Sequence, residues 1–272
     1  MGRPPAPDRR VNAGGLRDLA ESVAREAGAL LLDYAAGERR GVTTKSTATD
    51  LVSEADVATE RLIRERLTAA RPRDTIVGEE GDDHVPDDPS GLRWVVDPLD
   101  GTVNFLFSIP QWCVSVAVED DEGGLAGVIY DPSRDELWSA TRDGAATRNG
   151  EPVSGSTCDD LAMAMVATGF GYDAEVRRRQ AAIAAALLPQ VRDIRRLGSA
   201  ALDLAWAAAG RYDAYFERGV QPWDVAAGRL ICERAGLAVR DLEPDPPQGK
   251  GILVAPPALI DRLQVLVRPA AG

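Results

Sequence analysis

WVVDPLDGTVNF (residues 94–105) places two aspartates, Asp97 and Asp100, directly after a short β-branched segment. Residues 93–97 have the composition of a buried strand. Pro98 has no N–H to donate to a sheet, so we expect the strand to end at Asp97. Asp100 would then lie one tight turn away. The stretch therefore predicts a strand that delivers two carboxylates to one point.

The residues after the two aspartates suit an anion. Gly101 permits close backbone approach, and Thr102 can open a helix or turn whose free N–H groups face a negative charge. A strand followed by an aspartate-rich turn is common, and DPxD alone would favour that simpler explanation. The whole string DPLDGTVNF is far more specific.

Two further acidic segments supply candidate ligands. VGEEG (77–81) places Glu79 and Glu80 at the expected end of a strand, and QPWDVAAG (221–228) places Asp224 at the start of a helix. Taken alone, Asp224 would be explained as a helix cap. Taken together with the first stretch, these segments predict that acidic side chains from distant parts of the chain converge.

Converging carboxylates repel each other and raise each other's pKa values unless cations neutralise them. Mg²⁺ suits such a site because it binds a few carboxylates together with waters and phosphate oxygens. Four carboxylates balance about two divalent ions, which can then hold a phosphate. The predicted set of four is Glu79, Asp97, Asp100 and Asp224.

Composition and charge exclude several classes of protein. The chain has 272 residues, is 44% hydrophobic and carries a net charge of -12. Direct nucleic-acid binding requires a basic face and is not expected. The three cysteines lie far apart, which argues against a zinc site or a disulfide framework. The single histidine, His84, lies in the acidic stretch GDDHVPDDP, where a catalytic triad is not expected.

The sequence shows no targeting signal, and we therefore expect a cytoplasmic protein. The start, MGRPPAPDRR, lacks the apolar region of a signal peptide. The longest apolar run, AAIAAALL (181–188), is far too short to cross a bilayer, so no membrane partner is expected.

The chain divides into a tail and two halves. Residues 1–13 are rich in proline and arginine and are expected to be disordered. Residues 14–155 contain helical patterns followed by a run of strand patterns, which is an α+β signature. One of these helices is predicted to start at Ser53 and to bury Val57. Residues 156–272 alternate strand and helix patterns, which indicates an α/β half that completes the site.

Three motifs resemble the signatures of the inositol monophosphatase family of Mg²⁺-dependent, lithium-sensitive phosphatases. They are GEE (78–80), WVVDPLDGTVNF (94–105) and WDVAAG (223–228), in the family's order and separation. LGSAALDLAWAAAGRYDAYFE (197–217) is similar to the segment that lines the family's sugar pocket. The likeness covers roughly residues 15–267. It implies a layered α-β-α-β-α sandwich of the sugar phosphatase type, about two or three Mg²⁺ ions per site with Mn²⁺ as a substitute, and a homodimer.

The resemblance also implies residue roles. Glu79 and Thr102 would orient the attacking water, with Asp100 as the third catalytic residue. The implied metal ligands are Glu79, Asp97, the Leu99 carbonyl, Asp100 and Asp224. The implied substrate contacts are Asp100, Gly101, Thr102, Ser199, Ala200, Glu217 and Asp224.

A weaker metal site is implied near Lys45 and Asp50, which match the family's mobile loop. Asp56 would reach that site through water, although a helix cap explains Asp56 equally well. In the same way, Glu217 could be a solvated strand end rather than a substrate contact.

The implied reaction is hydrolysis of inositol 1-phosphate or a similar polyol phosphate by a metal-activated water. The motifs serve the phosphate, so fructose 1,6-bisphosphate, histidinol phosphate and 3'-phosphoadenosine 5'-phosphate remain alternative substrates. A regulatory interaction protein on the same fold is a further alternative. Haloacid dehalogenase chemistry is rejected because Pro98 stands where that reaction needs a nucleophilic aspartate. No P-loop motif occurs.

Overall fold

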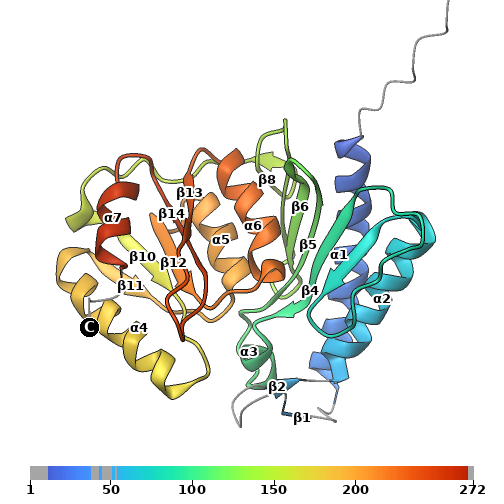
Figure 1. The fold of residues 1–272 in the computed structure, drawn as a ribbon, viewed down its shortest axis with the longest axis horizontal. Coiled ribbons are helices and arrows are strands. Elements are labelled where there is room, and N and C mark those ends of the chain that lie inside the picture. Colours follow the sequence, from blue (N-terminus) through green and yellow to red (C-terminus); the bar gives the residue numbers. More distant parts are fainter. Residues whose placement is uncertain (1–11, 38–42, 45–50, 53, 269–272) are drawn as a thin grey trace, which may run out of the picture.

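Two β-sheets and three layers of helices alternate through the molecule (Figure 1). The computed structural model describes residues 12–37, 43–44, 51–52 and 54–268. The first described feature is the cap of a long helix, where the Asn12 side chain accepts a hydrogen bond from the Gly15 N–H at 3.0 Å. The rest of the segment predicted to be disordered, residues 1–11, lies outside the described part.

The first sheet comes from the N-terminal half. Its strands are β3 (Thr75–Gly78), β4 (Arg93–Asp100), β5 (Cys113–Asp120), β6 (Gly123–Asp131), β7 (Glu136–Thr141), β8 (Thr147–Arg148) and β9 (Glu151–Pro152). These seven strands lie in sequence order. All pairs are antiparallel except β3 and β4, which run parallel and therefore end at the same edge.

The second sheet comes from the C-terminal half. Its strands are β10 (Met165–Thr168), β11 (Asp193–Arg195), β12 (Ala214–Arg218), β13 (Ala238–Leu242) and β14 (Gly251–Ala255). The spatial order is β11-β10-β12-β14-β13. The pairs that β10 forms are parallel and those that β14 forms are antiparallel, as expected for a half that alternates strands and helices.

The helices cover both faces of both sheets. They are α1 (Ala13–Ala36), α2 (Glu54–Ala70), α3 (Thr102–Leu106), α4 (Ala174–Leu187), α5 (Ala200–Ala208), α6 (Pro222–Arg234) and α7 (Ile260–Leu266). Short 3₁₀ turns at Leu161–Met163 and Leu188–Gln190 and a two-stranded pair of β1 (Thr43–Thr44) and β2 (Leu51–Val52) complete the described elements. None of the described helices combines the length and the apolar character needed to cross a membrane.

The layers follow the order predicted by the resemblance. In Figure 1, α1 and α2 cover the outer face of the first sheet, and α4 and α7 cover the outer face of the second. Helices α5 and α6 lie between the two sheets. This arrangement confirms the layered α-β-α-β-α sandwich.

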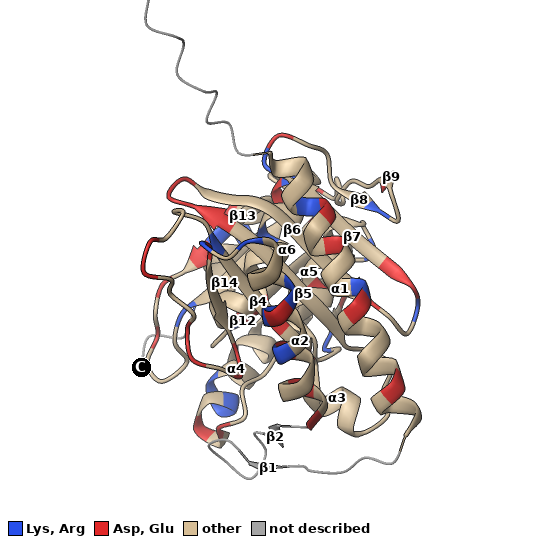
Figure 2. Cartoon of the chain, turned by 90° about the vertical axis from the view of Figure 1, so that its right-hand side faces the viewer, with Lys and Arg blue, Asp and Glu red and all other residues tan. Residues whose placement is uncertain are grey.

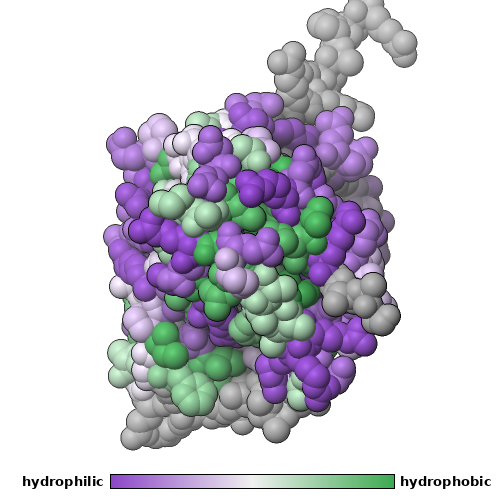
Figure 3. All heavy atoms as spheres, turned by 90° about the vertical axis from the view of Figure 1, so that its left-hand side faces the viewer, coloured by the Kyte–Doolittle hydropathy of each residue, from purple (hydrophilic) through white to green (hydrophobic). Residues whose placement is uncertain are grey.

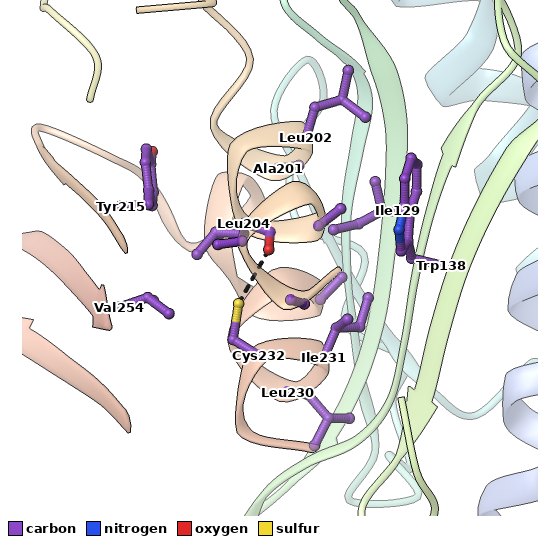
Figure 4. Close-up of a cluster of buried hydrophobic side chains, with 14 of the residues drawn as sticks. Ile129, Trp138, Ala201, Leu202, Leu204, Tyr215, Leu230, Ile231, Cys232 and Val254 are labelled. Carbon is purple, nitrogen blue, oxygen red and sulfur yellow. Dashed lines mark hydrogen bonds between the residues drawn. The ribbon is translucent and has the colours of Figure 1, made fainter. Parts of the chain in front are cut away.

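The central helical layer joins the two halves through one buried cluster. Leu204 of α5 and Ile231 of α6 are fully buried, as are Trp138 of the first sheet and Tyr215 of the second (Figure 4). The buried Cys232 thiol donates a hydrogen bond to the Leu204 carbonyl at 3.2 Å, which links α6 to α5. Because one core contacts both sheets, neither half buries its inner face without the other.

Helix α2 corrects one prediction from the sequence. Val57, expected in the core, is 51% exposed. The buried positions of α2 include Asp56, Glu60, Ile63 and Leu67, which follow helical spacing on one face. Val57 lies one residue, or about 100°, away from that face. The predicted start of this helix, Ser53, lies outside the described residues.

Strand β4 corrects a second prediction. The strand does not stop at Asp97 but continues through Pro98 to Asp100. Asp97 pairs with Ser115 and Asp100 pairs with Cys113, so three steps along β4 oppose two steps along β5. This extra residue is a β-bulge, which accommodates a proline that cannot donate to the ladder.

Loss of packing in the central layer should destabilise the whole molecule. We expect Leu204→Ala to lower the free energy of unfolding by about 2–5 kcal/mol, because it leaves a cavity between α5 and α6. Denaturant unfolding followed by circular dichroism measures this change. Leu188→Ala is the matched control: its side chain is 52% exposed and its loss should cost less than about 0.5 kcal/mol. Equal losses in the two variants would contradict a shared central core.

Candidate active site

A cavity of about 410 Å³ opens between the two sheets, where β3 and β4 end and α6 begins. Most of the residues predicted for the site line it. They are Glu79, Asp97, Leu99, Asp100, Gly101, Thr102, Ala200, Glu217 and Asp224. Segments separated by more than a hundred positions in the sequence therefore meet at one place.

The bulge in β4 places both aspartates on the same face of the sheet. Residues three apart on a regular strand point to opposite faces. The bulge adds one residue, so Asp97 and Asp100 lie opposite Ser115 and Cys113, which share a face. That face is directed toward the central helices, because the Ser115 hydroxyl donates to the Trp223 carbonyl of α6 at 3.3 Å.

Asp100 is held by the start of α5. Its Oδ2 accepts hydrogen bonds from the Ser199 hydroxyl at 2.6 Å and from the Ala201 N–H at 2.7 Å. Burial nevertheless raises the pKa of Asp100 from 3.8 to about 6, with a smaller contribution from the charge of Glu79. The hydrogen bonds at Ser199 and Ala201 oppose this shift but do not cancel it. The ionised form of Asp100 is therefore disfavoured unless a nearby positive charge balances it.

Asp97 is the most strongly perturbed of the β4 carboxylates. It is 1% exposed, and its Oδ1 accepts a hydrogen bond from the Leu99 N–H at 3.0 Å. Burial raises its pKa well above the ordinary value. Repulsion from Glu79, Asp100, Asp224 and Asp56 adds to that effect. The four predicted ligands thus interact electrostatically, as inferred from their convergence.

Asp224 lies in the first turn of α6 and has two roles. Its Oδ2 accepts a hydrogen bond from the Gln221 N–H at 2.7 Å, as the acidic member of a capping box. Burial raises its pKa well above the ordinary value, and repulsion from Asp100 adds to this effect. The N-cap is Gln221 and not Asp224, so the simpler explanation from the sequence is corrected: Asp224 closes the capping box from the third helical position. This role is compatible with its place among the carboxylates.

Gly101 and Thr102 connect the bulge to α3. Gly101 has φ of 94°, a left-handed conformation that favours glycine. The Thr102 hydroxyl lies 3.0 Å from the Leu99 carbonyl and 3.1 Å from Asp56 Oδ2. Its single proton can be donated to only one of these acceptors at a time, so Thr102 links α2 to the end of β4.

A group of three carboxylates lies beside this link. Asp56, Glu79 and Glu80 bring their ligand atoms within 4.8 Å of one another, the only such group of three or more acidic, histidine or cysteine residues in the part of the chain that the structure describes. Sequence reasoning had set Asp56 near a weaker metal site and gave Glu80 no role. Buried carboxylates with raised pKa values together with this compact group form a hard, oxygen-only donor set, which fits Mg²⁺ or Mn²⁺.

Glu217 forms the opposite wall of the cavity. Its Oε2 accepts a hydrogen bond from the Tyr215 hydroxyl at 2.8 Å. Burial raises the pKa of Glu217 to about 7. The backbone of Gly169 lies so close that a β-carbon there would overlap the Glu217 carboxyl group. The Glu217 side chain is thus held inside the cavity by its neighbours and is not a solvated strand end.

Ser199 lies elsewhere than the resemblance implied. It is 1% exposed and sits behind Asp100, where its hydroxyl caps α5 and donates to the Asp100 carboxylate. Ala200 alone of the pair lines the cavity. Lys45 and Asp50 lie outside the described residues.

Sequence reasoning missed part of the cavity wall. Gly169, Phe170, Gly171 and Arg196 line the cavity. The signal in the sequence was TGFG, a glycine-rich run directly after a strand, which allows close backbone approach. Arg196 places a positive charge near Glu217 and lowers the pKa of that carboxyl against the effect of burial.

Comparison with known proteins finds one family across the chain. The profile of the inositol monophosphatase family matches residues 15–268. Inositol-1-monophosphatase of Mycobacterium leprae (strain TN) is 43% identical over 266 residues, which cover 91% of each chain. A protein named Nus factor SuhB, from Salmonella typhimurium (strain 14028s / SGSC 2262), is 40% identical over 224 residues, 82% of this chain and 84% of that relative.

A solved structure gives the same result for the fold. Inositol monophosphatase from Anabaena (Nostoc) sp. PCC 7120 superposes with a TM-score of 0.82 at 33% identity. The superposition covers 96% of this chain and 99% of the other. The layered sandwich described above is therefore shared along nearly the whole chain.

The raised pKa of Asp100 predicts a pH dependence of stability in EDTA. The folded protein holds a proton that the unfolded chain releases, so this contribution is nearly complete below about pH 3 and is lost as the pH rises through about 6. A rise from 3.8 to about 6 corresponds to about 3 kcal/mol. Asp100→Asn cannot titrate. Its unfolding free energy relative to the natural chain should therefore increase by about 3 kcal/mol between about pH 3 and pH 7.

Denaturant unfolding of both chains across this pH range measures the effect. EDTA is required because a bound divalent cation supplies the opposing charge and removes the dependence. If the unfolding free energies of the two chains changed with pH in parallel, burial would not raise the pKa of Asp100, which would contradict this prediction.

Proposed function

This chain belongs to the inositol monophosphatase family, and on that premise we propose that it is a Mg²⁺-dependent, lithium-sensitive phosphomonoesterase acting on inositol 1-phosphate or a similar polyol phosphate. One observation carries the proposal: four carboxylates line one cavity, those of Glu79, Asp97, Asp100 and Asp224. Burial raises the pKa of Asp97, and repulsion from the other three carboxylates raises it further. A divalent cation would relieve this repulsion and would allow the carboxylates to remain ionised.

The residues that would hold the metal are those of the donor set described above. They are Glu79, Asp97, the Leu99 carbonyl, Asp100 and Asp224, with Asp56 and Glu80 beside Glu79. When bound, Mg²⁺ neutralises the carboxylates, makes water a better nucleophile and stabilises charge on the phosphoryl and leaving oxygens.

The chain's own groups position the reactants. Glu79 and the Thr102 hydroxyl lie on the side of the cavity shared with Asp56, where they would orient the attacking water. The backbone N–H groups at Gly101 and Thr102 bind phosphate oxygens at the start of α3. In-line attack then needs only that water and leaving group lie on opposite sides of phosphorus.

Glu217 is the group best placed to select the alcohol. It lines the cavity, is held by Tyr215, and has a pKa of about 7, so it can accept or donate a hydrogen bond to a polyol hydroxyl. Ala200 leaves space beside it. This assignment favours inositol 1-phosphate, the substrate class in the name of the M. leprae relative. Fructose 1,6-bisphosphate, histidinol phosphate and 3'-phosphoadenosine 5'-phosphate share the phosphate and are the alternatives.

A regulatory role is the second candidate, favoured by the relative named Nus factor SuhB. Direct contact with RNA is disfavoured by the net charge of -12. Acidic and basic residues alternate along the described backbone drawn in Figure 2. Such a role would therefore act through protein contacts and would not require the carboxylates of the cavity.

We also propose a homodimer, by likeness to the family. The face that carries α4 and α7 mixes hydrophobic and hydrophilic side chains (Figure 3). Helix α7 carries Val265, whose side chain is 64% exposed. Mixed surfaces of this kind are typical of interfaces that form between soluble subunits.

Removal of one carboxylate should abolish turnover without unfolding the protein. We expect Asp97→Asn and Asp224→Asn each to lower kcat by about a thousandfold, since several kcal/mol of transition-state stabilisation is lost. Phosphate release from inositol 1-phosphate at saturating Mg²⁺ measures the change. Asp121→Asn, in the exposed turn between β5 and β6, is the control and should retain full activity. Near-normal kcat in either cavity variant would overturn the proposed metal site.

Substrate selection is tested separately on a panel. With Mg²⁺, we expect inositol 1-phosphate to have the highest kcat/KM among the four phosphates named above, and EDTA to abolish turnover of all of them. Glu217→Gln should reduce that preference more than it reduces phosphate release itself. Equal rates on all four substrates would indicate a broad phosphatase, and no turnover of any would favour the regulatory role.

A further inference from the structure

Helix α2 presents Asp56, Glu60 and Arg64 at four-residue spacing toward the turn that follows β3. Asp56 belongs to the compact carboxylate group described above. Glu60 does not belong to that group, although it is only 2% exposed. A charged side chain is seldom buried unless specific partners hold it.

The partners of Glu60 lie in the turn that carries Glu79 and Glu80. Glu60 Oε2 accepts a hydrogen bond from the Glu80 backbone N–H at 2.7 Å. Glu60 Oε1 accepts one from Arg64 Nε at 2.7 Å. The guanidinium of Arg64 makes longer contacts with the same turn, 3.5 Å to the Ile76 carbonyl and 3.4 Å to the Gly81 carbonyl. The ion pair thus binds the backbone of this turn on both sides of Glu79.

The two glycines of VGEEG are explained by the same contact. A β-carbon on Gly78 would lie 2.7 Å from the carboxyl carbon of Glu60. One on Gly81 would lie 3.0 Å from Glu60 Oε1. The Glu60 carboxylate therefore packs directly against the backbone of both glycines, and a side chain at Gly78 would displace it.

We propose that Glu60, paired with Arg64, is a positioning residue for the metal site. It holds residues 78–81 against α2 so that Glu79 and Glu80 face Asp56, which lies one turn earlier on the same helix. Glu60 touches neither the cation nor the substrate. Because the backbone of Glu79 and Glu80 is already fixed, these two ligands need not be ordered when the cation binds, which favours binding.

This inference rests on one part of the proposed function, namely that the cavity binds a divalent cation. A purely structural ion pair would stabilise the fold without changing the affinity for the cation. The two roles are distinguished by measuring cation affinity and stability separately on the same folded protein.

Direct titration with Mn²⁺ in the absence of substrate tests the proposal. We expect Glu60→Gln to weaken Mn²⁺ binding by about 10–100-fold, the usual effect of losing a group that orients metal ligands. Glu65→Gln, on the same helix but exposed, removes the same charge away from the turn and should leave the affinity unchanged. Thermal unfolding in EDTA establishes that both variants are folded.

A second variant, Gly78→Ala, changes the position of the Glu60 carboxylate without removing its charge. It keeps every carboxylate but introduces a β-carbon that the Glu60 carboxyl group must move to accommodate. We expect it, too, to weaken Mn²⁺ binding by at least about tenfold. If Glu60→Gln does not fold, this variant decides the question.

The outcomes separate the two proposals. Affinities within about twofold of the natural chain in the folded variants would overturn the positioning role and leave the proposed function intact. Failure of the natural chain to bind Mn²⁺ at all would overturn both. Weaker binding in Glu60→Gln and Gly78→Ala, with Glu65→Gln unchanged, is the result that supports a positioning role for Glu60.

Discussion

Repulsion among buried carboxylates is the interaction on which the organisation of this molecule depends. Asp97, Asp100 and Asp224 are each buried with raised pKa values, and Glu79 adds to the repulsion. Protonation relieves part of this cost when no cation is bound, and a divalent cation would relieve it while the carboxylates stay ionised. The features that gather these groups therefore do not stabilise the ionised, cation-free protein. They are the bulge in β4, the start of α6, and the turn held against α2.

The sandwich supplies the rigidity that such a site requires. The central helices pack against both sheets, so the carboxylates of β4 and that of α6 are held by one continuous core. Asp100 is positioned by the first turn of α5, and Glu217 is positioned by Tyr215 on the second sheet. Each of these side chains is thus supported by an element whose own location is set by buried apolar contacts, and a site built this way needs little rearrangement on binding.

The sequence predicted the location of the site better than its local geometry. Residue type and order, together with the resemblance of the motifs, placed Glu79, Asp97, Asp100 and Asp224 at one site, and all four line the cavity. That they bind a metal ion stays a prediction. Propensity rules failed at Pro98, where pairing with β5 extended the strand through a bulge. Such a bulge depends on the partner strand, which one segment of sequence cannot reveal.

The position of Ser199 has a similar cause. The resemblance places this residue against the substrate, whereas its hydroxyl donates to Asp100. This contact depends on a residue 99 positions away in the sequence and not on the local pattern. The most direct test of the central claim is anomalous diffraction from crystals soaked in Mn²⁺. Our account predicts strong peaks between the oxygens of Glu79, Asp97, Asp100 and Asp224. A well-ordered cavity with no anomalous peak among these carboxylates would contradict it.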